Sequence, residues 1–176
     1  MAATFTAELI ARLVASETWT LDQGNLGGNS HKVDATVSVA AGTAASEIDL
    51  VWSDSRSLAV GTEQLELDNL TQLDSAGATL NARTFSVVKA ILIRNTTASG
   101  LLTIGGGTGG AGAADAFAGA GYPMVADSDK IDIPFGGFFF WYDPAGAAVT
   151  NGATDVLEVE ATTATQTYEI AIIGED

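Results

Sequence analysis

The sequence contains no cysteine and a single histidine, His31, in 176 residues. The absence of cysteine excludes disulfide bonds and thiolate metal sites. One histidine leaves a zinc ion with carboxylates as its only other ligands, which is an uncommon donor set. A serine hydrolase would have to use His31 as its base, and no Gly-x-Ser-x-Gly turn places a nucleophile for it. We therefore expect a protein that is not an enzyme.

Basic residues are scarce as well, with 7 Lys and Arg against 22 Asp and Glu, and the formal net charge is -15. Such a chain repels a phosphate backbone and an anionic membrane surface, so neither nucleic acid nor a membrane is expected as a partner. No run of about 20 apolar residues, the length that spans a bilayer, is present. Met1 to Phe5 lacks the basic and apolar regions of a secretory signal, which predicts a soluble protein made in the cytoplasm.

The chain does contain 47% hydrophobic residues, and they fall in short segments. Apolar residues at every second position predict strands with one buried and one exposed face. The segments with this pattern, or with a continuous apolar run between turn residues, are 33–39, 47–52, 64–68, 85–94, 101–104, 130–133, 138–142, 157–160 and 168–172. About ten short strands separated by turn signals are typical of an all-β antiparallel β-sandwich, here expected to be jelly-roll-like. Residues 21–176 are expected to form this single domain.

The first 20 residues show a different spacing, which we interpret as a short helical arm. Phe5, Leu9 and Leu13 lie four residues apart, as on one face of a helix, and alanines fill the remaining turns. A short terminal helix needs tertiary support. The arm is therefore expected either to pack on its own domain or to dock on a partner subunit. In the second case these three residues belong to a subunit or shell interface.

The run Phe-Phe-Phe-Trp-Tyr is aromatic on both of its predicted faces. Alternation sends Phe138, Phe140 and Tyr142 to one face, and Phe139 and Trp141 to the other. Either the run is a central strand between two layers, or one of its faces meets another chain. In the second interpretation Trp141 is a candidate subunit anchor.

Residues 85–94 and 101–104 are spaced as a hairpin. The stretch 105–121 that follows is mostly glycine and alanine and is expected to be an insertion in the sandwich. Its glycines match the pattern G-x-G-x-x-G, but a dinucleotide site needs a parallel βαβ unit around them, which the strand-rich sequence does not offer.

Two polar clusters contain oxygen ligands of the kind that calcium prefers. They are Asp127, Asp129 and Asp132, and Asp22, Asn25, Asn29 and Asp34. The first cluster lacks the glycine and the terminal glutamate of an EF-hand loop, and the second is a weak cluster as well. No metal and no cofactor is therefore predicted.

Four segments follow one another along the chain in a recognisable order. They are DLVWSDSRSLAVGTEQLELDNL, FSVVKAILIRNTTASGLLTIGG, IPFGGFFFWYDPAGAAVTNGATDVLEV and the terminal YEIAIIGED. In this order they resemble small β-sandwich virion proteins of tailed bacteriophages, in particular the capsid decoration, or cement, proteins. The resemblance covers roughly residues 47–176, with the stretch 105–121 as the main departure. None of the segments is a catalytic signature.

The resemblance implies a structural role, since decoration proteins clamp adjacent capsomers, usually as trimers at symmetry positions. The expected partners are the major capsid protein and further copies of the chain, in a homotrimer on the capsid surface of the virion. Similar modules serve in tails and fibres. The alternative is therefore a receptor- or glycan-binding module, in which Trp19, Trp52 or Tyr122 would stack on sugars, or a structural component of the tail or neck.

Overall fold

The computed structural model describes residues 7–20, 26–71, 82–105, 130–152 and 155–176, and its regular elements there are all strands. The strands are β1 (Ala7–Thr20), β2 (Leu26–Ala41), β3 (Glu47–Ile48), β4 (Leu50–Leu58), β5 (Gly61–Glu66), β6 (Val87–Asn95), β7 (Leu101–Gly105), β8 (Lys130–Pro134), β9 (Phe138–Ala148), β10 (Val156–Ala161) and β11 (Gln166–Glu175). Each segment predicted as a strand overlaps one or more of them, although 64–68 extends beyond the end of β5 and 85–94 begins before β6. Within these ranges no helix is long and apolar enough to cross a membrane. The prediction of an all-β chain is confirmed.

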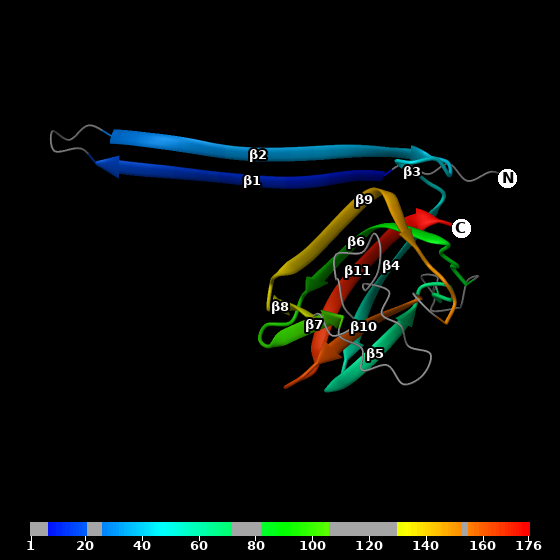
Figure 1. Cartoon of the computed structure of the whole chain (residues 1–176). Coiled ribbons are helices and arrows are strands. Elements are labelled where there is room, and N and C mark those ends of the chain that lie inside the picture. Colours follow the sequence, from blue (N-terminus) through cyan, green and yellow to red (C-terminus); the bar gives the residue numbers. More distant parts are fainter. Residues whose placement is uncertain (1–6, 21–25, 72–81, 106–129, 153–154) are drawn as a thin grey trace.

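Eight of the strands form a sandwich of two four-stranded antiparallel sheets, β4-β11-β6-β9 and β5-β10-β7-β8 (Figure 1). The first strand of the sandwich pairs with the last, β4 with β11, and the second pairs with the second last, β5 with β10. The pairing continues inward through β6 with β9 to β7 with β8. A long hairpin folded over in this way is a jelly roll, as the sequence predicts.

The predicted hairpin between residues 85–94 and 101–104 is wrong, because β6 and β7 lie in different sheets. Both segments are strands, as predicted, and only their pairing differs. The connection between them is long enough to step across the roughly 10 Å that separates packed sheets. Spacing along the chain does not distinguish such a step from a turn within one sheet.

The main hydrophobic core lies between the two sheets. Its largest fully buried side chains include Trp52, Phe85, Ile91, Ile93, Leu102, Ile104 and Ile133. Burial of each such side chain contributes about 1.5–3 kcal/mol. The indole of Trp52 keeps a hydrogen-bond partner, since its Nε1 donates to the carbonyl of Thr71 at 3.0 Å.

The remaining three strands form a separate sheet in the order β1-β2-β3. In it β1 and β2 form a long antiparallel hairpin, with a register that runs from Ala7 opposite Val39 to Thr20 opposite Leu26, and the two-residue β3 pairs in parallel with the end of β2. Figure 1 shows this hairpin extending past the end of the sandwich. The predicted N-terminal helix is therefore wrong over residues 7–20. A spacing of four residues is an even number, so a strand satisfies it as well as a helix does.

Candidate interaction surface

The base of the hairpin, around Leu9, Val37 and Val39, packs on the sheet β4-β11-β6-β9 and forms a second hydrophobic cluster there. We call this part of the hairpin its root, and the side of the sheet turned away from the other sheet its outer face. The buried members of this cluster are Val39, Ile48, Ala90 and Ile173, and the half-buried ones are Leu9, Val37, Val51, Phe140 and Tyr142. Leu9 and Val37 are register partners in the hairpin, so both strands of the ribbon contribute to the contact. One end of the outer face is thereby removed from solvent.

Lys89 fixes the loop that follows the hairpin to the same sheet. Its side chain is 1% exposed, and its ammonium group donates to the carbonyls of Ala44 at 2.8 Å and Glu47 at 2.6 Å. It also forms an ion pair with Glu175 in β11. The pairing of β6 with β9 shifts register between Val88 and Ala90. Lys89 lies at this irregularity, where the strict alternation of side chains between the two faces of the strand is interrupted. The root of the hairpin is thus held by a buried, fully paired cation.

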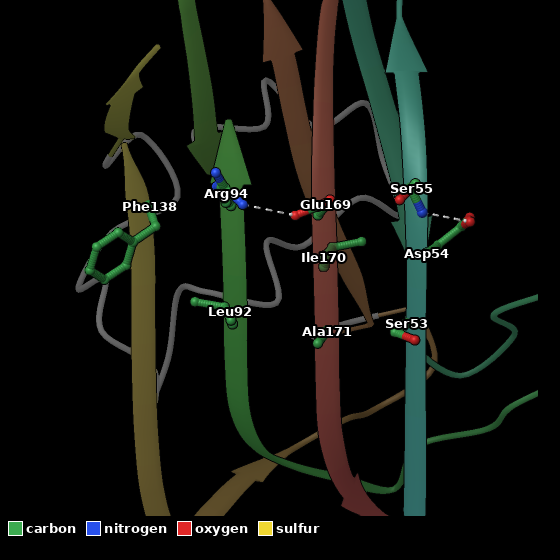
Figure 2. Close-up of a pocket in the computed structure, with 9 residues that line it drawn as sticks. All are labelled: Ser53, Asp54, Ser55, Leu92, Arg94, Phe138, Glu169, Ile170 and Ala171. Carbon is green, nitrogen blue, oxygen red and sulfur yellow. Dashed lines mark hydrogen bonds and ion pairs between the residues drawn. The ribbon is translucent and has the colours of Figure 1, made fainter. Parts of the chain in front are cut away.

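Side chains on the outer face form three rows across the four strands, taken in the order β4, β11, β6, β9. The first row is Val51, Ile173, Ala90 and Tyr142, the second is Ser53, Ala171, Leu92 and Phe140, and the third is Ser55, Glu169, Arg94 and Phe138. The hairpin root covers the first row. The second and third rows, Phe140 excepted, line an open depression of about 790 Å³ (Figure 2). We call these seven residues the open face.

The open face is apolar in character, with one weak ion pair. Phe138 is 69% exposed and Leu92 is 42% exposed, and both line the same depression. Arg94 Nη1 and Glu169 Oε2 are 3.6 Å apart and both side chains are more than half exposed, so this pair contributes little to stability. Such a surface can dock an apolar partner, or stack an aromatic ring on a ligand.

Only one of the four predicted interface residues is described at the surface between hairpin and sheet. Leu9 is half-buried there. Leu13 pairs with Val33 in the backbone register of the hairpin, its side chain is outside the description, and Phe5 lies outside the described residues. Trp141 is half-buried and packs against the main core, between the sheets.

The predicted alternation of the aromatic run in β9 is confirmed, because Phe139 and Trp141 pack against the main core while Phe140 and Tyr142 pack against the second cluster. However, β9 is an edge strand of its sheet, so the first interpretation, a central strand, is wrong. The exposed aromatic residue of the run is Phe138.

The other residues singled out from the sequence do not form a ligand site in the described part of the chain. Trp52 is buried in the core and is not available to stack on a sugar. Asp132 accepts a hydrogen bond from Thr103 Oγ1 at 2.8 Å. No group of three His, Cys, Asp or Glu side chains in the described ranges could hold a metal ion. The side chain of Trp19 and the residues Tyr122, Asp127, Asp129, Asp22, Asn25 and 106–121 fall outside the description.

A network of ionisable groups joins the two sheets, and one of its members, Asp54, also lines the depression. Arg56 donates from Nε to Glu63 at 2.8 Å and from Nη1 to Asp54 at 2.7 Å, and the hydroxyl of Tyr168 donates to Glu63 at 2.8 Å. Burial, and then the hydrogen bond to Glu63, raise the pKa of Tyr168 well above its usual value of 10.0. Burial alone would lower the pKa of Arg56, but its hydrogen bond and charge interaction with Glu63 outweigh this and raise it. The network therefore serves stability.

Comparison with known proteins gives no match to a family model, a curated protein or a solved structure. The function has to be argued from the chain itself. Two features of the structure were not predicted from the sequence, namely the buried Lys89 that holds the hairpin root and the open face. For the open face, the signal in the sequence was Phe138, the first residue of the aromatic run.

Proposed function

We propose that this protein is a non-enzymatic structural component of a virion, which decorates a phage capsid and stabilises it by clamping adjacent shell subunits. The observation that carries the proposal is the hairpin β1–β2, which extends beyond the jelly-roll body (Figure 1). Its root is fixed by the second hydrophobic cluster and by Lys89. A compact body with a firmly rooted projecting arm is suited to hold a neighbouring subunit.

The jelly-roll topology supports this proposal at the level of fold. Jelly rolls are common among viral capsid proteins, and they also occur in lectins and cupins. The segments of the sequence that resemble decoration proteins cover roughly residues 47–176, the part of the chain that contains the sandwich strands β4 to β11. This support is an analogy, because one fold hosts many functions.

The charge of the chain supports a basic shell surface as the partner. A net charge of -15 keeps free subunits apart in solution and attracts a surface of opposite sign. The partners in this proposal are the major capsid protein and further copies of the chain, assembled as a homotrimer on the capsid surface. Binding strength then comes from many modest contacts repeated over a symmetric lattice.

An add-back experiment tests the proposal. Purified protein is titrated onto particles assembled without it, and bound copies are counted after sedimentation. We expect saturable binding, weakened by salt, together with increased resistance of the particles to heat. Binding that is absent, or that does not saturate, would contradict a decoration role.

The open face favours a second candidate, a receptor- or glycan-binding module of a tail or fibre. Exposed Phe138 lies next to Arg94 on the adjacent strand, and Glu169 follows on the strand beyond (Figure 2). An aromatic ring near hydrogen-bonding side chains is suited to stack on a sugar. A glycan array tests this candidate. Specific binding that is lost in Phe138→Ala would favour it over decoration.

A further inference from the structure

We propose that the open face is the docking site for the β1–β2 hairpin of a second copy of this chain. The inference deepens the proposed function, because it specifies the contact by which copies assemble. It rests on two surfaces within the same molecule, namely the hairpin beyond its root, where Ala11 and Ala35 are exposed, and the two rows of the sheet that the root leaves uncovered.

The hairpin is too long to be supported by its own sandwich alone. Its paired strands extend over about 45 Å at roughly 3.4 Å per residue. Its described hydrophobic contacts with the sandwich are at the root, at Leu9, Val37 and Val39. Ala11 and its register partner Ala35, directly beyond the root, are exposed. An isolated two-stranded hairpin is marginally stable at best in water. The outer part of the ribbon therefore needs a surface to lie on.

The open face continues a surface that the hairpin already binds. The first row of the outer face is covered by the root, and the second and third rows follow along the same four strands. Leu92 stands one row beyond buried Ala90 on β6, and Phe138 stands two rows beyond Tyr142 on β9. A second ribbon laid beside the first would repeat a contact of the same chemistry.

The dimensions of the two surfaces match. Successive rows on one face of a sheet are about 6.8 Å apart, since each row is two residues further along a strand, and paired strands lie about 4.8 Å apart. A two-stranded ribbon can therefore lie across the two open rows. In the sequence, the apolar alternation of the hairpin continues past the root at Leu13 and Val33, which are register partners.

The distribution of charge favours a copy of the chain over the shell as occupant. Residues 7–41 contain two basic and four acidic side chains, a net charge of -2, although the whole chain carries -15. The charged residues of the open face are Arg94 and Glu169, which are opposite in sign. Asp54, which also lines the depression, is paired with Arg56. Both surfaces thus carry little net charge in an acidic chain, and two copies can meet there without bringing their acidic surfaces together. A basic shell would instead be attracted to the acidic remainder.

The docking joins different surfaces of the two copies, so it is a head-to-tail contact that closes into a ring if the rotation between copies allows it. A ring of three matches the homotrimer of the proposed function. In each copy the root stays on its own sheet, held by Lys89, and only the outer ribbon reaches the neighbour.

The test uses the purified full-length chain without particles, and measures its mass in solution by light scattering across a range of concentrations. The wild type is expected to form a concentration-dependent oligomer. Leu92→Asp in the open face and Ala35→Asp in the hairpin should each raise the dissociation constant by at least about tenfold, because either carboxylate would be buried without a partner. Val60→Asp is the matched control, since Val60 is 62% exposed and lies outside both surfaces. It should leave the oligomer unchanged.

Three outcomes would overturn the inference. They are a wild type that stays monomeric, an oligomer that survives both variants, or an oligomer that the Val60 control weakens equally. The result is distinguishable from failure of the proposed function, which is measured on particles. A monomeric chain whose particle binding is lost in Leu92→Asp would show that the shell, and not a second copy, occupies the open face. Circular dichroism of each variant confirms that it remains folded.

Discussion

Lys89 and Glu175 form an ion pair at the root of the hairpin, with Lys89 almost completely buried. The same ammonium group donates to the carbonyls of Ala44 and Glu47. One side chain from β6 therefore joins the last strand of the sandwich to the loop that carries the hairpin. Together with the second hydrophobic cluster, this contact holds the root of the hairpin on the sandwich.

Lys89→Met should destabilise the protein by about 3–5 kcal/mol, because it leaves the carboxylate of Glu175 and two carbonyls without their donor. Equilibrium unfolding in urea measures the loss. Lys130→Met is the matched control, since the ion pair of Lys130 with Glu160 is solvent-exposed and is expected to contribute less than about 1 kcal/mol. Equal effects of the two substitutions would contradict the role assigned to Lys89.

Gly146→Ala should be destabilising for two reasons, the positive φ at this position and the lack of space for a Cβ atom. Gly152→Ala is the control that separates them. Gly146 has φ of 76°, and an added Cβ would collide with Val87 Cγ1 and approach Lys89 Cγ to 3.0 Å. Gly152 has φ of 70° but nothing within 4 Å of an added Cβ. Gly152→Ala therefore reports only the backbone cost of about 1 kcal/mol. We expect Gly146→Ala to cost about 1–3 kcal/mol more in urea unfolding, and a difference near zero would contradict the close packing of β9 on β6.

Leu9→Asp and Ile10→Asp should differ sharply although the residues are neighbours. Leu9 is half-buried in the second cluster, whereas Ile10 is 58% exposed. A carboxylate at position 9 should loosen the root by about 2 kcal/mol, seen as faster amide hydrogen exchange at residues 40–48. The same charge at position 10 should change exchange little. Similar effects at both positions would contradict the strand assignment of this segment.

The stability of the protein should fall in alkali, and Tyr168 should account for part of the loss. The pKa of Tyr168 is raised above its unfolded value of 10.0, so its contribution is fully present below pH 10 and is lost progressively as the pH rises above it. Tyr168→Phe has no group to ionise there. The free energy of unfolding, measured between about pH 9 and pH 11, should therefore fall less steeply in the variant. Parallel pH profiles would show that the phenol does not titrate as described.

The strands of the sandwich could be predicted because their pattern is local. Residues 168–172 in β11 alternate, as do residues 33–39 in β2 of the hairpin, and alternation is a direct consequence of strand geometry. The segment 7–20 was misread because Leu9 and Leu13 fit both periods. What decides between them is the pairing with β2, at Val37 and Val33, and that pairing is not local.

The interaction surface could not be predicted, because it is assembled by topology. Leu92, Phe138 and Glu169 lie on three strands, and only the order β4-β11-β6-β9 makes them neighbours. In the sequence, Lys89 is a charged residue inside an apolar run. Its partners Ala44 and Glu175 are far from it along the chain. Trp141 was a reasonable anchor by composition, but the pleat of β9 turns it toward the core.

The central claim is that the protein is an abundant structural component of a capsid. Quantitative mass spectrometry of purified virions, with the major shell protein as internal reference, tests it most directly. The account predicts a copy number near that of the shell protein, in a ratio fixed by the lattice. A handful of copies per particle, or none, would contradict it.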